Sequence, residues 1–417
     1  MIINTRKLVT AIATSAILMN AMAPAFAFAE TTIQVTGNGS YSDNNAKVEQ
    51  RSDTTVVQSN DAHVSNKVSG TASTGGNDAN DNTGGNTAIK TGSAQSNATV
   101  SNTLNSNSAD VLNCNCDKDT KVLISGNGSH SDNDVKLKNS NTTGVFQTNN
   151  ADVYNNVDTT AKTGDNDANR NTGGDTTIIT GNAKSNATVS TVANANQASV
   201  GGNGKGEGGS LQAIVSGNGS YSDNDIDLTF DRYTTLKQDN YANVYNWVDA
   251  SAKTGYNDAN DNTGGDVAIK TGKAYAVANV DNLVNFNTAN LDCGCLTNTK
   301  VKVDGNGYDS DNDVKAHFND NKALFQDNYD WTDNWVDASA KTGDNDTNRN
   351  TGRVDNSNDP VVTITGDAKS DQNVDNTGNA NVIGSGSGFH MPKMNVDVNF
   401  DLSWFWTWLN ASSHTSS

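Results

Sequence analysis

The stretch LKQDNYANVYNWVDASA, residues 236–252, decides the fold. Starting at Leu236, every second side chain is small, apolar or a carboxamide, and the side chains between them are mostly charged or aromatic. A period of two is the signature of an extended strand, because successive side chains point to opposite faces. We therefore expect a β-strand with Asn246 and Val248 on its inner face and Trp247 on its outer face.

The same alternation recurs before and after this stretch, so the chain contains four copies of it. In each copy the inner face carries glutamine and asparagine. Stacking the copies would place identical amides above one another, where they can hydrogen-bond along the stack. The predicted inward ladder consists of Gln58, Asn60, Asn66, Gln147, Asn149, Asn155, Gln238, Asn240, Asn246, Gln326, Asn328 and Asn334.

A second motif, G-N-G-x-x-S-D-N, marks the repeat: it begins at Gly37, Gly126 and Gly217, with a degenerate copy at Gly305. Thr-Gly and Ser-Gly turn signals recur on a finer scale, which predicts segments of about 18 residues, five to a unit of about 90 residues. We predict an all-β protein, a β-solenoid of such short coils stacked into a rod. The alternative is four tandem β-sandwich domains of about 90 residues each.

The repeats and composition shifts divide the chain into seven parts. The predicted boundaries are a signal peptide at 1–29, repeat units at 30–121, 122–210, 211–300 and 301–383, a Gly/Ser linker at 384–394, and an aromatic C-terminal strand and tail at 395–417.

The N-terminus has the pattern of a secretory leader. Arg6 and Lys7 precede an apolar run, and Ala27-Phe28-Ala29 supplies small residues for cleavage. The run is too short for a lasting membrane span. The expected location is therefore extracellular or at the cell surface, with no stable membrane crossing.

Composition excludes several classes. The formal net charge is −19, which argues against nucleic acid as a partner, since its recognition rests on basic patches. Hydrophobic residues make up only 34% of the chain, too few for a leucine-rich core of this length, and composition alone would permit disorder. Disorder requires no two-faced pattern, however, and the alternation therefore favours a folded chain.

The cysteines form two C-x-C pairs. In an exported protein, Cys114, Cys116, Cys293 and Cys295 are first of all disulfide candidates, within or between chains. A tetrathiolate metal site is the alternative, although the usual C-x2-C spacing is absent.

The sequence shows no catalytic constellation, and we expect a protein without enzymatic activity and without a required cofactor. The five histidines are scattered, and no nucleophile elbow, zinc motif or phosphate loop occurs.

The Asn/Asp-rich turns offer oxygen ligands at alternate positions, so calcium is the candidate ion. The candidate ligands are Asp78, Asp81, Asp167, Asp258, Asp261 and Asp346. Arg170 and Arg349 place a cation where a ligand would be wanted, and tight turns need Asn, Asp and Gly in any case. A purely structural turn is therefore the competing interpretation.

The C-terminal segment is more apolar than any repeat. One face of the predicted strand consists of Val396, Val398, Phe400, Leu402, Trp404, Trp406 and Trp408. An apolar strand of this kind must be covered, and we expect it to serve as an assembly strand on a neighbouring copy or as a cap on its own chain.

In style, the alternating Gln147-x-Asn149-x-Ala151-x-Val153-x-Asn155 resembles the repeats of curlin-type amyloid fibre subunits. The glycine- and aspartate-rich turns resemble, more distantly, the β-roll of bacterial adhesins and toxins. The Gln-x-Gly step of curlin repeats is replaced here by Gln147-Thr148-Asn149. The resemblance implies a secreted bacterial fibre or surface protein and transfers no functional residue.

These observations lead to two functional hypotheses. The first is a self-associating structural subunit of an extracellular filament or coat. The second is an adhesin or stalk that binds a surface glycan or protein, in a calcium-dependent manner if the turns hold the ion. The second hypothesis draws on the outward aromatic residues, which increase in number along the chain and end with Trp331 and Trp335.

Overall fold

The computed structural model describes residues 21–22, 31–111, 119–201, 210–291, 299–352 and 361–384, and all regular secondary structure in them is β. The strands are β1 (Ala21–Met22), β2 (Thr31–Thr36), β3 (Asp43–Ser73), β4 (Thr87–Lys90), β5 (Ala94–Val111), β6 (Thr120–Ser125), β7 (Asp132–Lys162), β8 (Thr176–Ile179), β9 (Ala183–Val200), β10 (Leu211–Ser216), β11 (Asp223–Lys253), β12 (Val267–Lys270), β13 (Ala274–Leu291), β14 (Thr299–Asp304), β15 (Asp311–Lys341), β16 (Val361–Ile364) and β17 (Ala368–Ile383).

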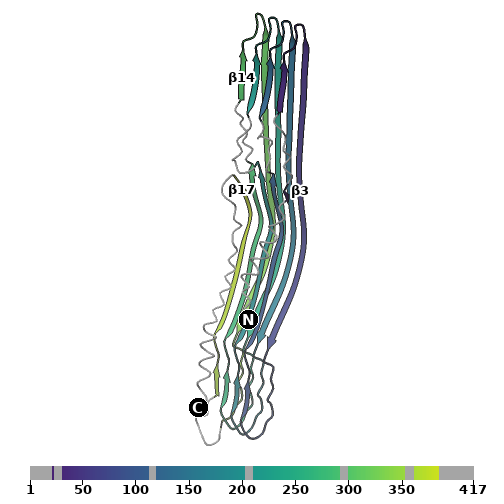
Figure 1. Ribbon diagram of the computed structural model, residues 1–417. Helices are drawn as coiled ribbons and strands as arrows, with labels where there is room; N and C mark the ends of the chain where they lie inside the picture. The colour runs from purple at the N-terminus through teal and green to yellow at the C-terminus, as the bar shows by residue number, and fades with distance from the viewer. Residues whose placement is uncertain are drawn as a thin grey trace, which may run out of the picture.

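The strands from β2 onward form four equivalent coils: coil 1 is β2–β5, coil 2 is β6–β9, coil 3 is β10–β13 and coil 4 is β14–β17. Each strand pairs in parallel with its counterpart in the neighbouring coil, residue on equivalent residue. Side chains that stack on one another in the long strands are 89, 91 and 88 residues apart in the sequence. The molecule is a stack of four coils whose strands form parallel sheets. It is long in the strand direction and thin in the stacking direction (Figure 1).

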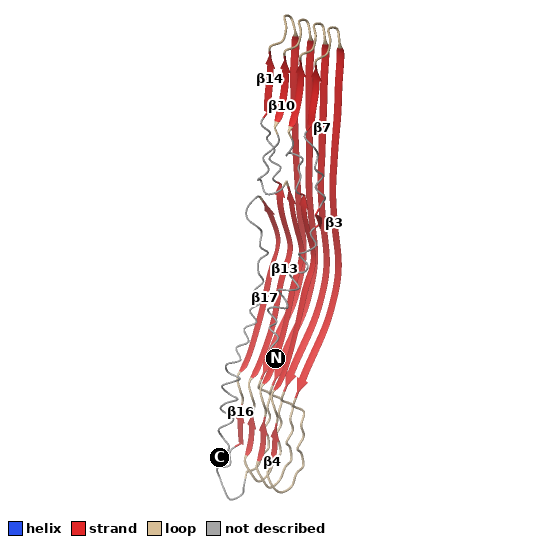
Figure 2. Cartoon of the chain, in the orientation of Figure 1, coloured by secondary structure: helices blue, strands red, loops and turns tan. Residues whose placement is uncertain are grey.

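Within one coil the chain runs along one layer and returns along the other. The long strand of 31 residues forms the first layer, and the three shorter strands form the second (Figure 2). Hydrogen bonds across the layers in coil 1 join Gln58 to the carbonyl of Ser108 and the hydroxyl of Thr74 to the carbonyl of Gly92.

The predicted all-β solenoid is confirmed, but the predicted coil length is wrong. A coil comprises a whole unit of about 90 residues, because every ladder partner lies one full unit away. Thr36-Gly37 lies at a corner, between β2 and β3, whereas Thr74-Gly75 and Thr91-Gly92 lie opposite each other across the two layers. The long strand continues without a corner through the positions where the 18-residue step predicts one. The molecule is therefore extended along its strands, whereas twenty short coils would have extended it along the stack. The β-sandwich alternative is excluded, since the strands pair between units and not within them.

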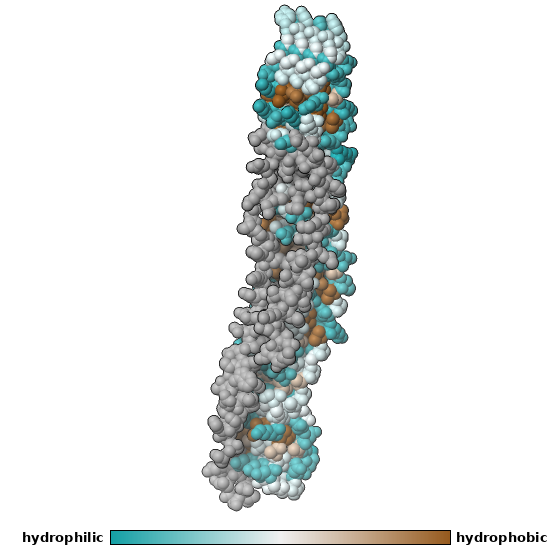
Figure 3. All heavy atoms as spheres, viewed as in Figure 1, coloured by the Kyte–Doolittle hydropathy of each residue, from teal (hydrophilic) through white to brown (hydrophobic). Residues whose placement is uncertain are grey.

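The inner faces carry small and medium-sized side chains, so the two layers lie close together. Alanine and valine fill the core between the C-terminal half of β7 or β11 and the facing strands β9 and β13. Ile, Val and Leu fill the core at the other end of the long strands, where β6 and β10 face them. In coils 2 and 3 these side chains are buried, whereas in coil 4 the equivalent Val301 and Val303 are 50% and 46% exposed. Figure 3 shows apolar residues at the surface at the level of β14, in line with this exposure.

One backbone irregularity recurs in β5, β9, β13 and β17. Asn105, Asn194, Asn285 and Asn379 all have positive φ, between 54° and 62°. Asparagine tolerates this left-handed conformation better than most residues. The ladder skips each of these residues, and the burial alternation of the strand shifts by one residue there. The inner face therefore moves from even to odd positions within β5.

Candidate functional site: the open edges and their side-chain columns

The molecule has two open sides, one on coil 1 and one on coil 4. In the long-strand sheet, ordered β15-β11-β7-β3, both β3 and β15 have a single neighbour among the described strands. Each therefore offers an unpaired backbone edge of 31 residues. On coil 1, the two-residue β1 pairs with Ala109 and Asp110 of β5, which shows that this edge accepts a parallel strand.

Inside the stack, inward asparagines form a continuous column along β3, β7, β11 and β15. The Asn149 amide donates to the Oδ1 of Asn240 in the next coil at 3.0 Å, and its own Oδ1 accepts from Asn60 at 3.0 Å. The same amide donates at 2.9 Å to Asn196 in the facing layer. Each interior amide thus bonds both along the stack and across it, which satisfies a polar group that would otherwise be costly to bury.

The facing half of this network was not among the residues predicted from the sequence. Asn107, Asn196, Asn287 and Asn381 form a second column opposite the first, joined by bonds of 2.9 to 3.0 Å. An N-x-N pattern recurs in all four units at these positions and could have revealed the column. Its phase is opposite to that of the preceding strand because of the left-handed asparagine, and a strict period-two rule therefore overlooks it.

A second amide column lies nearer the other end of the long strands. Asn66, Asn155 and Asn246 each donate to the next member of this column at 2.7 to 2.8 Å, and Asn334 is the last acceptor. They face Asn102, Thr191, Asn282 and Asn376 in the other layer.

In the glutamine column every hydrogen bond between two glutamines runs from one coil to the preceding coil, and the last acceptor has no partner. Gln147 donates to the Oε1 of Gln58 at 2.7 Å, Gln238 donates to Gln147 at 2.8 Å, and Gln326 donates to Gln238 at 2.7 Å. At coil 4 the Oε1 of Gln326 is buried and has no hydrogen-bond partner. All twelve amides of the predicted inward ladder lie on the inner face, buried in coils 2 and 3 and partly exposed in coils 1 and 4.

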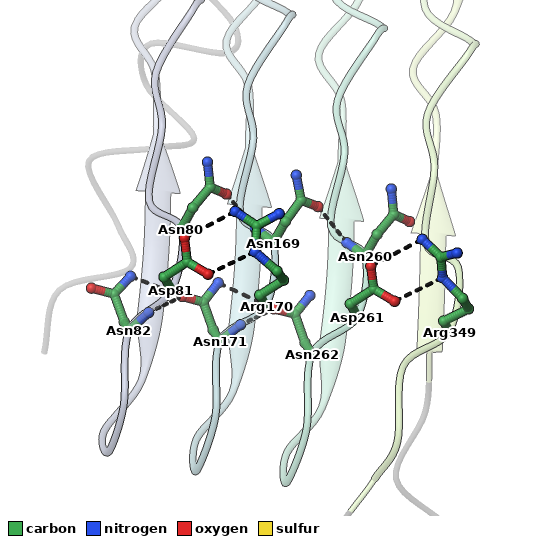
Figure 4. A network of polar contacts seen from close by, with 10 residues as sticks. All are labelled: Asn80, Asp81, Asn82, Asn169, Arg170, Asn171, Asn260, Asp261, Asn262 and Arg349. Atoms are coloured by element: carbon green, nitrogen blue, oxygen red, sulfur yellow. Dashed lines mark hydrogen bonds and ion pairs between the residues drawn. The ribbon is translucent and has the colours of Figure 1, made fainter.

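In the turn after the long strand, charges alternate in sign from coil to coil (Figure 4). Arg170 makes a two-pronged contact with Asp81, at 2.6 and 2.9 Å, and Arg349 does the same with Asp261, at 2.7 and 3.0 Å. The hydrogen bond from Arg170 lowers the pKa of the Asp81 carboxyl. Two of the six candidate calcium ligands are therefore engaged by arginine.

The other four candidate ligands, Asp78, Asp167, Asp258 and Asp346, stack in one column. Burial, followed by the neighbouring carboxylates, raises the pKa of Asp167 and of Asp258. No group of three or more His, Cys, Asp or Glu side chains in the described part of the chain is arranged to hold a metal ion. The column is a row of like charges held in place by the backbone ladder.

The outer face of the long strands carries stacked aromatic rings in coils 3 and 4. The rings of Trp247 and Trp335 are 4.0 Å apart between centroids, and those of Tyr241 and Tyr329 are 4.9 Å apart. These side chains are between 40% and 51% exposed. They form a solvent-facing aromatic strip on one half of the molecule.

Several predicted residues lie outside the described ranges: the four cysteines and the seven apolar residues of the C-terminal strand. Within those ranges no helix has the length and hydropathy needed to cross a membrane. Comparisons with protein-family models, with curated proteins and with solved structures each return no match.

Proposed function

We propose that this protein is a structural subunit of an extracellular filament or cell-surface coat, in which copies associate through their β-strand edges. The observation that carries the proposal is the pair of open 31-residue edges on β3 and β15. Unpaired strand edges are templates for another chain, and proteins that remain monomeric protect them.

Two usual forms of protection are missing along β3, whereas β15 carries one inward-facing charge, Asp330, in register with the core residue Ala242. None of the three prolines of the chain falls within the described strands, and β3 follows one unbroken alternation over its full length. The inner face of β3 carries no charged side chain that would oppose another layer. Long and regular strand edges of this kind favour association with another chain.

Secretion forms part of the same proposal. It rests on the predicted leader and on the acidic composition, both of which suit a protein that works outside the cell. We propose no enzymatic role, since the columns of amides, glycines and small apolar residues provide no nucleophile with a paired base.

Electron microscopy of the purified protein tests the proposal directly. The chain is expressed from the full sequence so that the host can process the leader, and it is examined at increasing concentration. Ordered filaments or sheets support the structural role. Isolated rods of constant length at every concentration would refute it.

The aromatic strip supports the second candidate, an adhesin or stalk. The strip formed by Tyr241, Trp247, Tyr329 and Trp335 offers exposed ring faces on which sugar rings can stack. A glycan array comparing the wild type with a Trp247→Ser/Trp335→Ser variant tests this role, and calcium dependence is checked by adding chelator. Loss of binding in the variant alone would support an adhesin.

A further inference from the structure

Glycine columns run along the stack, and each leaves an open position at one end. At Gly75, Gly164 and Gly255 an added Cβ would overlap the carbonyl oxygen of the equivalent glycine in the next coil. The last member, Gly343 in coil 4, has no atom within 4 Å of that position. No residue of the described ranges therefore occupies, at the coil 4 end, the space that the next coil fills inside the stack.

A second column points the opposite way. At Gly181, Gly272 and Gly366 an added Cβ would overlap the carbonyl oxygen of the glycine in the preceding coil. The first member, Gly92 in coil 1, has nothing within 4 Å. Each end of the molecule thus has a glycine at a position where a side chain would overlap backbone only if a further coil were present. Neither Gly343 nor Gly92 has a positive φ, so backbone conformation does not require glycine at either position.

The column of alternating aspartate and arginine has complementary charges at the two ends. The alternating column begins with Asp81 in coil 1 and ends with Arg349 in coil 4. If a second molecule continues the stack, its Asp81 lies next to Arg349 and the alternation is unbroken. Like charges would meet only if the repeat number were odd.

The glutamine column has the same polarity. Each glutamine donates to the Oε1 of the preceding coil, so the amide of Gln58 in an added molecule would donate to Gln326, whose Oε1 is the buried acceptor without a partner.

The outer faces of the long strands are mixed: Asp311 would meet Asp43 and Lys315 would meet Lys47, which repeats like-charge contacts already present between Asp43 and Asp132 and between Lys47 and Lys136. Three aspartates of coil 4 lie in columns whose coil 1 member is serine, so no two of these carboxylates would meet at a junction. The pairs in register are Asp327 with Ser59, Asp333 with Ser65, and Asp337 with Ser69.

From these complementary ends we infer that copies of this chain join head to tail and in register, with coil 4 of one copy on coil 1 of the next. The partner is a second copy, and the resulting filament has two different ends. The inference rests on the proposed function and specifies its interface. The β1 segment, which pairs with Ala109 and Asp110, falls within the predicted leader, and its removal would free that part of the coil 1 edge.

Two single-methyl variants test this geometry. Gly343→Ala puts a methyl group on the coil 4 side and Gly92→Ala puts one on the coil 1 side, each in space that is empty in the single molecule. At a junction each methyl would overlap backbone, and we expect elongation to slow by at least about tenfold. Thermal unfolding checks that both variants fold, and Ser73→Ala, whose side chain is exposed on the outer face of β3, is the matched control.

Mixing the two variants gives the decisive result. Over the time in which the wild type elongates, each variant alone should stay mostly monomeric, whereas the mixture should form mainly a one-to-one dimer, because the intact coil 4 face of the Gly92→Ala chain fits the intact coil 1 face of the Gly343→Ala chain. Light scattering after size-exclusion chromatography measures this. A homodimer of either variant, or filaments of either alone at the wild-type rate, would overturn the head-to-tail inference and leave the filament proposal standing. A wild-type chain that stays monomeric would overturn both.

The charge column provides a second, independent test. A fourfold variant reverses every member of the column while keeping the pairs within the molecule: Asp81→Arg, Arg170→Asp, Asp261→Arg and Arg349→Asp. We expect it to elongate its own seeds normally and wild-type seeds about fivefold to tenfold more slowly at low salt, with the difference lost at high salt. Equal rates on both seeds at low salt would contradict the proposed junction.

A matched control reverses a pair whose column has a neutral coil 1 member. Lys273 and Asp367 form an ion pair of 2.8 Å, and Ser93 is the coil 1 residue of that column. The Lys273→Asp/Asp367→Lys variant should elongate wild-type seeds at the wild-type rate, and a slowed rate would show that any charge reversal disturbs growth.

Discussion

Coils 2 and 3 have the same kind of sequence and the same register as coils 1 and 4, yet they differ sharply in burial. Asn149 and Asn240 are buried, whereas Asn60 and Asn328, in the same column, are partly exposed. The difference comes from the number of neighbours, two for an interior coil and one for an end coil. A coil of this kind therefore acquires its core from the coils on either side, as expected for a solenoid.

The largest effect should come from a charge in the interior core. Val248 is fully buried in coil 3, and Val248→Asp would leave a carboxylate without a partner, at a cost of about 4 kcal/mol or more in the free energy of unfolding. Trp247→Ser, at a neighbouring residue that is 40% exposed, should cost much less. Urea unfolding followed by circular dichroism measures both.

The end-coil counterpart sharpens this comparison. Val336 stacks on Val248 but is only partly buried, so Val336→Asp should be milder than Val248→Asp because water reaches the carboxylate. Equal loss of stability in Val248→Asp and Trp247→Ser would mean that the assignment of inner and outer faces is wrong.

The glycine column should give the next largest contrast. Gly164→Ala places a methyl group against the carbonyl of Gly255, whereas Gly343→Ala meets nothing within 4 Å. We expect a loss of about 2–3 kcal/mol for the interior change and less than about 0.5 kcal/mol for the end change. The melting temperature of monomeric protein at low concentration is the measurement, and similar losses at both sites would contradict the close packing of the interior coils.

An amide deletion should have a smaller effect that still depends on position. Asn149 accepts hydrogen bonds from Asn60 and Asn107 and donates to Asn196 and Asn240. Its replacement by alanine leaves several buried partners unsatisfied, for a cost of about 2–3 kcal/mol.

Asn60 is the matched end-coil control. It donates to Asn107 and Asn149 but has no preceding coil, so Asn60→Ala should cost about 1 kcal/mol. If the Asn60→Ala cost in urea unfolding matches that of Asn149→Ala, position in the stack does not govern the strength of the network.

The smallest effect concerns pH. Burial and the carboxylates of Asp167 and Asp346 raise the pKa of Asp258 above its ordinary value, so the folded state binds the proton more readily than the unfolded chain. Lowering the pH from above the folded-state pKa towards the ordinary value of about 3.9 should therefore increase the contribution of this group to stability.

Asp258→Asn removes that proton-binding group and two like-charge contacts. We expect the variant to gain about 0.5–1 kcal/mol at neutral pH and to show a flatter pH dependence than the wild type. Melting curves between pH 4 and pH 7 measure both quantities. A variant less stable than the wild type at neutral pH would indicate that Asp258 contributes a favourable contact instead.

The sequence by itself determined the all-β class, the repeat and the inner face of the long strand. All three are local or periodic properties: alternation places Gln147 and Val153 inward whatever lies opposite them, and a repeat of GNG motifs implies stacked units. The inner amides were predictable for the same reason, since each repeats at a constant interval along the chain.

Only the tertiary structure decided the length of a coil, the facing partners and the difference between interior and end. Thr-Gly signals such as Thr74-Gly75 show where a strand ends but not whether the chain turns back there, and Thr74 in fact faces Gly92 across the two layers. Which segments meet depends on packing between the layers. The left-handed Asn105 shifts the strand phase by one residue and so brings Asn107 to face Asn60, which a period-two pattern cannot represent. The open ends arise from the number of stacked coils, a property of the whole stack that no single repeat contains.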